Sequence, residues 1–200
     1  MRVLGLCGSL RRDSHNRRLL AAAARVLGAG VEFEDWAGLE QVPPYSEDRD
    51  VTPAPSAVED FRAALARADA VVIATPEYNH SVPGQLKNAL DWASRPFPHN
   101  ALRAKPVAVI GASTSLFGAV WAQAELRRVL AASGAHVIDE ELPVASAHET
   151  LATDGSPRDR ELQDALAGII EQLRQAARAP SSGPRDQRTD AEGAVGFPVS

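Results

Sequence analysis

The chain has 200 residues and a formal net charge of −5, and its length suits a single α/β domain. This mildly acidic balance disfavours nonspecific binding to nucleic acid or to an anionic membrane. With one cysteine, Cys7, the chain cannot form an internal disulfide or a cysteine-based zinc site, and no apolar run is long enough to span a bilayer, so we expect a cytoplasmic protein.

Apolar runs that suit short strands alternate with longer stretches of helical periodicity. The strand-like runs are Val3–Cys7, Val31–Trp36, Ala70–Thr75, Pro106–Ala112 and His136–Leu142. Each is followed by an amphipathic helical pattern, and these patterns include Leu20, Phe61, Leu86, Leu126 and Leu166. The strict alternation of five strands and five helices predicts a parallel sheet with helices packed against it.

Two segments depart from this alternation. Gly38–Pro55 contains Pro43, Pro44, Pro53 and Pro55 and is long for a strand-to-helix loop, and such loops are often functional or cover part of the fold. Residues 179–200 have too few apolar side chains to offset the entropy of ordering. We therefore predict one domain over residues 1–178, followed by a disordered tail.

The loop after the first predicted strand carries groups that suit a phosphate. Just before a helical pattern it combines Gly8, the hydroxyls of Ser9 and Ser14, the guanidinium of Arg11 and the amide of Asn16. A phosphate needs several hydrogen-bond donors and favours the positive end of a helix dipole. The loop lacks both the dinucleotide fingerprint and the P-loop pattern. A surface loop in which Ser14 only caps the next helix remains the alternative.

The loop after the third predicted strand, Thr75–Gly84, combines stiff ends with amide-bearing residues. Pro76 and Pro83 restrict the backbone, and Gly84 permits a sharp turn into the next helix. Such a loop could hold a flat heteroaromatic ligand through main-chain hydrogen bonds. A purely structural loop, with Tyr78 packed for burial, is the alternative.

Other candidate residues give weaker signals. The loop after the fourth strand, Gly111–Gly118, is rich in hydroxyls but lacks the G-x-S-x-G pattern of a serine nucleophile. The histidines show no metal-ligand spacing, so we expect no metal site. We expect His15 at an exposed first turn, His80 as no more than a candidate proton donor, and Cys7 as a small core side chain.

Two motifs at their observed separation resemble the NADPH-dependent FMN reductase family. Within it, the chain is most similar to bacterial chromate, quinone and azo-dye reductases. The first motif is Gly8-Ser9-x-Arg11-x-x-Ser14-x-Asn16. The second is Pro76-Glu77-Tyr78-Asn79-x-Ser81-x-Pro83-Gly84-x-Leu86-Lys87-Asn88-Ala89-x-Asp91-Trp92. The resemblance covers the predicted domain and leaves the tail outside.

The resemblance implies a flavodoxin-like three-layer fold, with a five-stranded parallel sheet in the order 2-1-3-4-5 and helices on both faces, and noncovalently bound FMN. It implies that the FMN phosphate is held by Ser9, Arg11, Ser14 and Asn16. It implies that the flavin ring is held by Pro76, Glu77, Tyr78 and Asn79, extending through Ser81 to Gly84, with Ser113 facing the ring. A homodimer or homotetramer acting on a small-molecule acceptor is also implied.

The expected activity is hydride transfer from NADPH or NADH to FMN, followed by two-electron reduction of a quinone, azo dye, chromate or free flavin. The flavin would supply the chemistry, so no catalytic side chain is assigned. An FMN-binding electron carrier and a redox-sensing interaction protein, both without nicotinamide activity, are the alternatives. Arg11 disfavours the carrier, because carrier flavodoxins tend to bind phosphate with hydroxyls alone, and only the tail supports the sensor.

Overall fold

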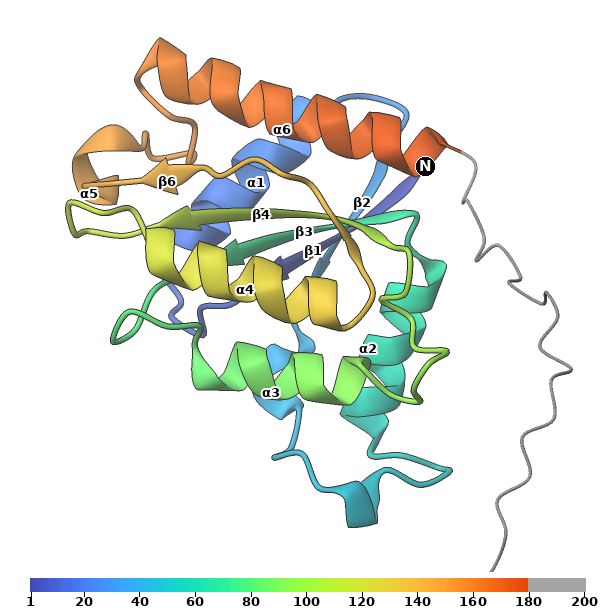
Figure 1. The fold of residues 1–200 in the computed structure, drawn as a ribbon. Helices are drawn as coiled ribbons and strands as arrows, with labels where there is room; N and C mark the ends of the chain where they lie inside the picture. Colours follow the sequence, from blue (N-terminus) through green and yellow to red (C-terminus); the bar gives the residue numbers. More distant parts are fainter. Residues whose placement is uncertain (180–200) are drawn as a thin grey trace, which may run out of the picture.

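The structure, a computed structural model, describes residues 1–179 and consists of a central parallel sheet between two layers of helices (Figure 1). The strands are β1 (Arg2–Cys7), β2 (Glu32–Trp36), β3 (Ala70–Thr75), β4 (Pro106–Ala112), β5 (His136–Val137) and β6 (Pro143–Val144). Their order is β2-β1-β3-β4-β5, with β6 also paired to β4. This order and the all-parallel pairing confirm the flavodoxin-like arrangement.

Helices cover both faces of the sheet. One face carries α1 (His15–Leu27) and α6 (Arg160–Arg178), and the other carries α2 (Ser56–Arg67), α3 (Gly84–Ala93) and α4 (Val120–Ala132) (Figure 1). The five predicted helices are all present. The described residues also contain a short α5 (Ala147–Thr150) and two 3₁₀ turns, η1 (Gly38–Gln41) and η2 (Glu47–Arg49), which the periodicity did not predict.

Alternate residues of the central strands enter two separate cores. Leu4 and Ile73 pack toward α2, α3 and α4, while Val3, Val72 and Ile110 pack toward α1 and α6. Strands buried on both faces read as continuous apolar runs, which is why β1, β3 and β4 were recognisable in the sequence. Cys7 is buried in the α1–α6 core as expected, and burial raises the pKa of its thiol.

The fifth predicted strand, His136–Leu142, is wrong as a single element. Only His136–Val137 and Pro143–Val144 pair with β4 as strands. Ile138 and Leu142 each keep one backbone hydrogen bond to β4, and the chain leaves the ladder between them. The buried side chain of Gln123, from α4, holds the end of this segment: its Nε2 donates to the Leu142 carbonyl at 3.2 Å and its Oε1 accepts from the Leu142 N–H at 3.2 Å. The three acidic residues 139–141 are exposed, since a bulged segment at a sheet edge reaches solvent.

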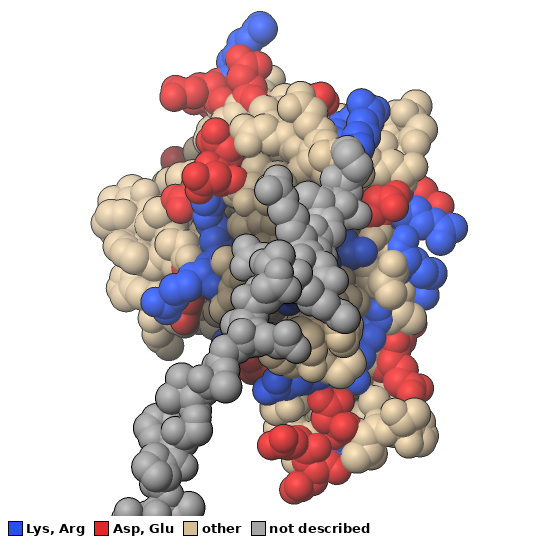
Figure 2. All heavy atoms as spheres, turned by 45° about the vertical axis from the view of Figure 1, so that its right-hand side comes forward, with Lys and Arg blue, Asp and Glu red and all other residues tan. Residues whose placement is uncertain are grey.

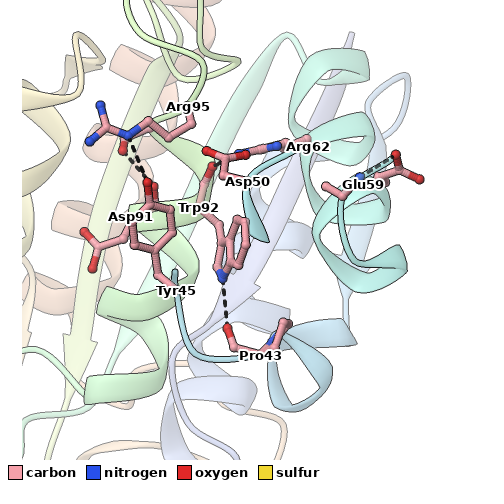
Figure 3. Close-up of polar contacts among 10 residues, drawn as sticks. Pro43, Tyr45, Asp50, Glu59, Arg62, Asp91, Trp92 and Arg95 are labelled. Carbon is pink, nitrogen blue, oxygen red and sulfur yellow. Dashed lines mark hydrogen bonds and ion pairs between the residues drawn. The ribbon is translucent and has the colours of Figure 1, made fainter. Parts of the chain in front are cut away.

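The proline-rich segment Gly38–Pro55 is fastened to α3 and α2 (Figure 3). The Trp92 indole N–H donates to the Pro43 carbonyl at 2.8 Å, and the Tyr45 N–H donates to the Asn88 side chain at 2.7 Å. Arg62 of α2 binds both the Asp50 carboxylate at 2.9 Å and the Trp92 carbonyl at 2.8 Å. The segment therefore covers part of the fold, one of the two expectations for a loop of this length.

The predicted domain end falls at the last residue of α6, Arg178. The prediction of a disordered tail lies outside the described residues, apart from Ala179. Within residues 1–179, none of the helices is both long enough and apolar enough to traverse a membrane.

Candidate functional site

A cavity of about 130 Å³ lies at the carboxyl ends of β1, β3 and β4. It is lined by Ser9, Arg11, Ser14, His15, Asn16, Pro76, Glu77, Tyr78, Ala112, Ser113 and Thr114. A second hollow of about 320 Å³ shares Arg11 and Tyr78 with it and is further lined by Gly8, Leu10, Pro83, Gly84 and Gln85. In an open α/β sheet, ligands bind at the carboxyl ends of the strands, so both hollows lie where a ligand is expected.

The three loops that the sequence singled out meet at these hollows. Most of the predicted site residues line the first, and Gly84 lines the second. Asn79 and Ser81 line neither, because they belong to a turn that extends beyond the lining. Their role as cofactor ligands stays a prediction, as does that of the residues in the lining.

The first loop presents hydroxyl groups at the start of α1. The Ser14 Oγ accepts a hydrogen bond from the Arg17 N–H at 3.4 Å, so Ser14 caps the helix as the structural interpretation expected. The Ser9 Oγ accepts from the Arg11 N–H at 3.4 Å. A hydroxyl that accepts an N–H still has its own proton to donate. Capping the helix and donating to an anion are therefore compatible roles for Ser14.

The Asn16 side chain is already committed within the fold. Its Nδ2 donates to the Ala112 carbonyl at 2.8 Å, and its Oδ1 accepts from the Ala112 N–H at 2.8 Å. This buried pair of hydrogen bonds joins the last residue of β4 to the first turn of α1. Asn16 thus joins two walls of the cavity, and the phosphate-binding role that the resemblance implies for it stays a prediction.

The loop after β3 forms a tight turn. Tyr78 and Ser81 exchange backbone hydrogen bonds at 3.2 and 3.1 Å. The two residues between them, Asn79 and His80, have φ values of 53° and 60°. Asparagine tolerates this left-handed conformation better than other non-glycine residues, and a turn with two such residues is a two-residue hairpin turn of type I′. Half of the surface of Tyr78 is exposed, which contradicts the alternative interpretation of a structural loop with Tyr78 packed for burial.

Two carboxylates tie this turn to α4. The helix begins after Ala119, whose methyl side chain cannot accept a capping hydrogen bond. The Glu77 carboxylate accepts one instead, from the Ala122 N–H at 3.1 Å. In return, the Glu125 carboxylate of α4 accepts from the Ser81 hydroxyl at 2.6 Å and from the Val82 N–H at 3.3 Å. These hydrogen bonds lower the pKa of Glu125, with the Ser81 hydroxyl contributing most.

His80 packs against α4 rather than into the cavity. Its ring meets the edge of Trp121 with centroids 4.4 Å apart, and its Nδ1 lies 3.6 Å from the Glu77 carboxylate. Phe117 also packs against Trp121, with ring centroids 4.8 Å apart. Trp121 is thus a packing residue, although it remains partly exposed, whereas Trp92 is fully buried.

Sequence reasoning missed three contributors to this site. It expected His15 at an exposed turn, but His15 is half-buried and lines the cavity. Its position between Ser14 and Asn16 was the available signal. The Ala112 backbone and Glu125 gave no signal, since their partners lie 96 and 44 residues away.

A larger hollow, of about 630 Å³, lies at the opposite end of the strands. Its lining is rich in alanine and includes Arg103, Lys105 and His136. The Lys105 ammonium donates to the Ala68 carbonyl there, and burial lowers the pKa of Lys105. The amino ends of the strands lie here, whereas ligands of open α/β sheets bind at the carboxyl ends, so this hollow is not the candidate site although it is larger.

On the face drawn in Figure 2, acidic and basic side chains are interspersed.

Comparisons with known proteins place the chain in a family. Residues 1–149 match the family model of NADPH-dependent FMN reductase. An NAD(P)H-dependent FMN reductase of Pseudomonas aeruginosa is 40% identical over 177 residues, 88% of this chain and 92% of that protein. A 2-hydroxy-1,4-benzoquinone reductase of a Burkholderia species is 43% identical over 131 residues, 66% of this chain and 70% of that protein.

A solved structure extends the match to the fold. The NAD(P)H:(acceptor) oxidoreductase FerB, a flavoenzyme of Paracoccus denitrificans, superposes with a TM-score of 0.77 at 35% identity. The superposition covers 88% of this chain and 96% of that one. The family model, the relatives and the shared fold agree with the sequence motifs. The chain belongs to the NADPH-dependent FMN reductase family.

Proposed function

We propose that this protein oxidises NAD(P)H and reduces a quinone in a two-step, ping-pong cycle. As a member of its family it is an oxidoreductase, with FMN and NAD(P)H as cofactors. When bound, FMN supplies the ring that takes up hydride from the nicotinamide and returns two electrons to the acceptor. The protein's own part is to bind the cofactor, to orient it and to leave one face of it open.

The observation that carries the proposal is the meeting of three loops at one cavity. The donor set fits FMN, because hydroxyls and a guanidinium lie at the start of a helix while a loop of main-chain groups lies opposite. The first part suits a phosphate monoester, and the second suits the polar edge of a flat ring. The adjoining hollow gives room beyond the first cavity.

We assign different parts of FMN to the two loops. We assign the phosphate to the Ser9 and Ser14 hydroxyls, to Arg11 and to the free N–H groups of the first turn of α1. We assign the ring to the main chain of residues 76–79. The Glu77 carboxylate caps α4 and so serves the ring by holding that main chain in place. Main-chain donors aimed at the ring would stabilise negative charge that develops there on reduction.

A benzoquinone-type acceptor is favoured by the relative from the Burkholderia species, which is a 2-hydroxy-1,4-benzoquinone reductase. Half-exposed Tyr78 lies between the two hollows and offers an aromatic face to such a planar ring. Chromate, azo dyes and free flavin are the other acceptors of our proposal. Comparing their turnover with that of a benzoquinone ranks them.

We also propose that the protein works in the cytoplasm as a homodimer or homotetramer. The apolar side chains of Leu116 and Phe117, 81% and 56% exposed, follow cavity-lining Ser113 and Thr114 in the chain. Phe117 packs against Trp121, and exposed apolar side chains that lie close together are frequent at protein interfaces. The mass of the protein in solution, measured by light scattering, tests the proposal, and a monomer would contradict it.

The test of the activity is an anaerobic absorbance titration of the protein loaded with FMN. We expect one equivalent of NADPH or NADH to bleach the flavin band and a benzoquinone to restore it. A flavin absorbance that neither NADPH nor NADH changes would indicate an electron carrier or a redox sensor instead. A protein that takes up no FMN would overturn the assignment of both loops.

A further inference from the structure

His15 is a polar side chain of the cavity without a partner in the fold. It is the first residue of α1, directly after the helix cap Ser14, and it lines the cavity with Ser9 and Arg11. Its Nδ1 is shielded from solvent, yet no group in residues 1–179 forms a hydrogen bond with it. Because water cannot reach Nδ1, this atom does not face the open cavity, and a ligand there would meet the part of the ring that carries Nε2.

The charges around His15 favour its neutral form while the cavity holds no anion. Burial lowers the pKa of His15 most, and the guanidinium groups of Arg18 and Arg11 lower it further. His148 of α5 acts in the same direction, and only Asp13 opposes it. An anion placed in the cavity would reverse this balance, because it would face His15, Arg11 and the positive end of α1 together.

We propose that the His15 imidazole is a ligand of the FMN phosphate and becomes protonated when that phosphate binds. The inference rests on the proposed function and adds a ligand to its phosphate site. A phosphate monoester carries nearly two negative charges at neutral pH, and a charged donor binds it more strongly than a neutral one. FMN binding then takes up a proton at His15, which riboflavin, lacking the phosphate, does not require.

The sign of the pH dependence follows from this linkage. His15 has a higher pKa with phosphate bound than without it, so its contribution to affinity is complete below the pKa of the free protein. The contribution is lost as the pH rises through the pKa of the complex. One unit of difference between the two pKa values corresponds to about a tenfold change in FMN affinity. The window begins below 6.5, because the fold lowers the pKa of His15 from that value.

The experiment compares the dissociation constants of FMN and riboflavin, measured by flavin fluorescence between about pH 5.5 and pH 8.5. The proteins are the wild type, His15→Gln, and His136→Gln as a matched control at the opposite end of the strands. We expect the preference of the wild type for FMN over riboflavin to fall about tenfold more across this range than that of His15→Gln. The titration of the phosphate itself cancels in this comparison, and His136→Gln should follow the wild type.

Failure of this inference is distinguishable from failure of the proposed function. If FMN binds and His15→Gln follows the wild-type pH profile, His15 is no phosphate ligand, although the flavin site stands. If riboflavin affinity shows the same pH dependence as FMN affinity, His15 responds to something other than phosphate and the inference fails. If neither flavin binds the wild type, the site itself is wrong. Riboflavin binding by His15→Gln also verifies that the variant is folded.

A second readout follows the proton directly. The carbon-13 and proton shifts of the His15 ring report its pKa in the protein with riboflavin and in the protein with FMN. We expect a higher pKa with FMN than with riboflavin. Equal values in the two complexes would overturn the inference.

Discussion

The two loops that form the cavity use their side chains in opposite ways. In the loop after β1, the Ser9 and Ser14 hydroxyls and the Arg11 guanidinium line the cavity. In the loop after β3, the Glu77 carboxylate and the Ser81 hydroxyl are bonded to α4. The first loop therefore offers side chains to a ligand, whereas the second offers mainly its backbone.

This difference predicts how substitutions act. A change in the first loop removes a ligand group directly and should discriminate between flavins with and without a phosphate. A change in the second loop acts through the shape of the main chain, so it should affect stability and both flavins together. The predictions below separate these behaviours.

Arg11→Ala should have the largest effect. Loss of a charged hydrogen bond costs about 2–3 kcal/mol, so we expect FMN to bind about 30- to 150-fold more weakly, with riboflavin affinity almost unchanged. Equilibrium titration with both flavins measures this. Arg12→Ala is the matched control, since exposed Arg12 lies outside the cavity lining and should keep wild-type affinities. Equal losses for both flavins in Arg11→Ala would contradict the phosphate role.

Glu77→Ala should destabilise the protein by about 1–2 kcal/mol, because the start of α4 loses its capping carboxylate. Glu77→Gln keeps an acceptor oxygen and should lose less than half of that. Chemical denaturation of both variants gives the comparison. FMN and riboflavin affinities should fall together in Glu77→Ala. A loss confined to FMN would mean that Glu77 contacts the phosphate end instead.

Asn79→Ala should cost about 1 kcal/mol of stability, because alanine is disfavoured at the φ of 53° that the turn requires. Asn79→Gly also removes the side chain but accepts this backbone, so it should keep wild-type stability and flavin affinity. Unchanged affinity and turnover in Asn79→Ala would count against a role for the turn in holding the ring. Weak flavin binding by Asn79→Gly would show that the ligand is the side chain, not the backbone.

Glu125→Gln should have the smallest effect, and this effect should disappear in acid. The pKa of Glu125 lies below its ordinary value of 4.5 in the fold, so the carboxylate contributes stability above that pH. This contribution is lost as the pH falls through the lowered pKa. Urea midpoints between about pH 3 and pH 6 should therefore fall more steeply for the wild type than for Glu125→Gln. Parallel curves would contradict the bracing role of Glu125.

The sequence predicted those parts of the molecule that depend on neighbours in the chain. Continuous apolar runs predicted β1, β3 and β4, and the first-loop residues follow β1 directly, so their meeting at the sheet edge was foreseeable. The interruption of the last strand was not foreseeable, and the side chain that holds the end of that segment, Gln123, comes from another element. The bonds of Asn16 to Ala112 and of Glu77 to Ala122 likewise join residues whose proximity only the folded chain creates.

A crystal structure of the protein with FMN tests the central claim most directly. We predict a phosphate within hydrogen-bond distance of the Ser9 and Ser14 hydroxyls and of Arg11, with the polar edge of the ring against main-chain groups of residues 76–79. FMN bound in the hollow at the amino ends of the strands would contradict this account. So would a ring held by the Glu77 carboxylate, since that group would then have left α4.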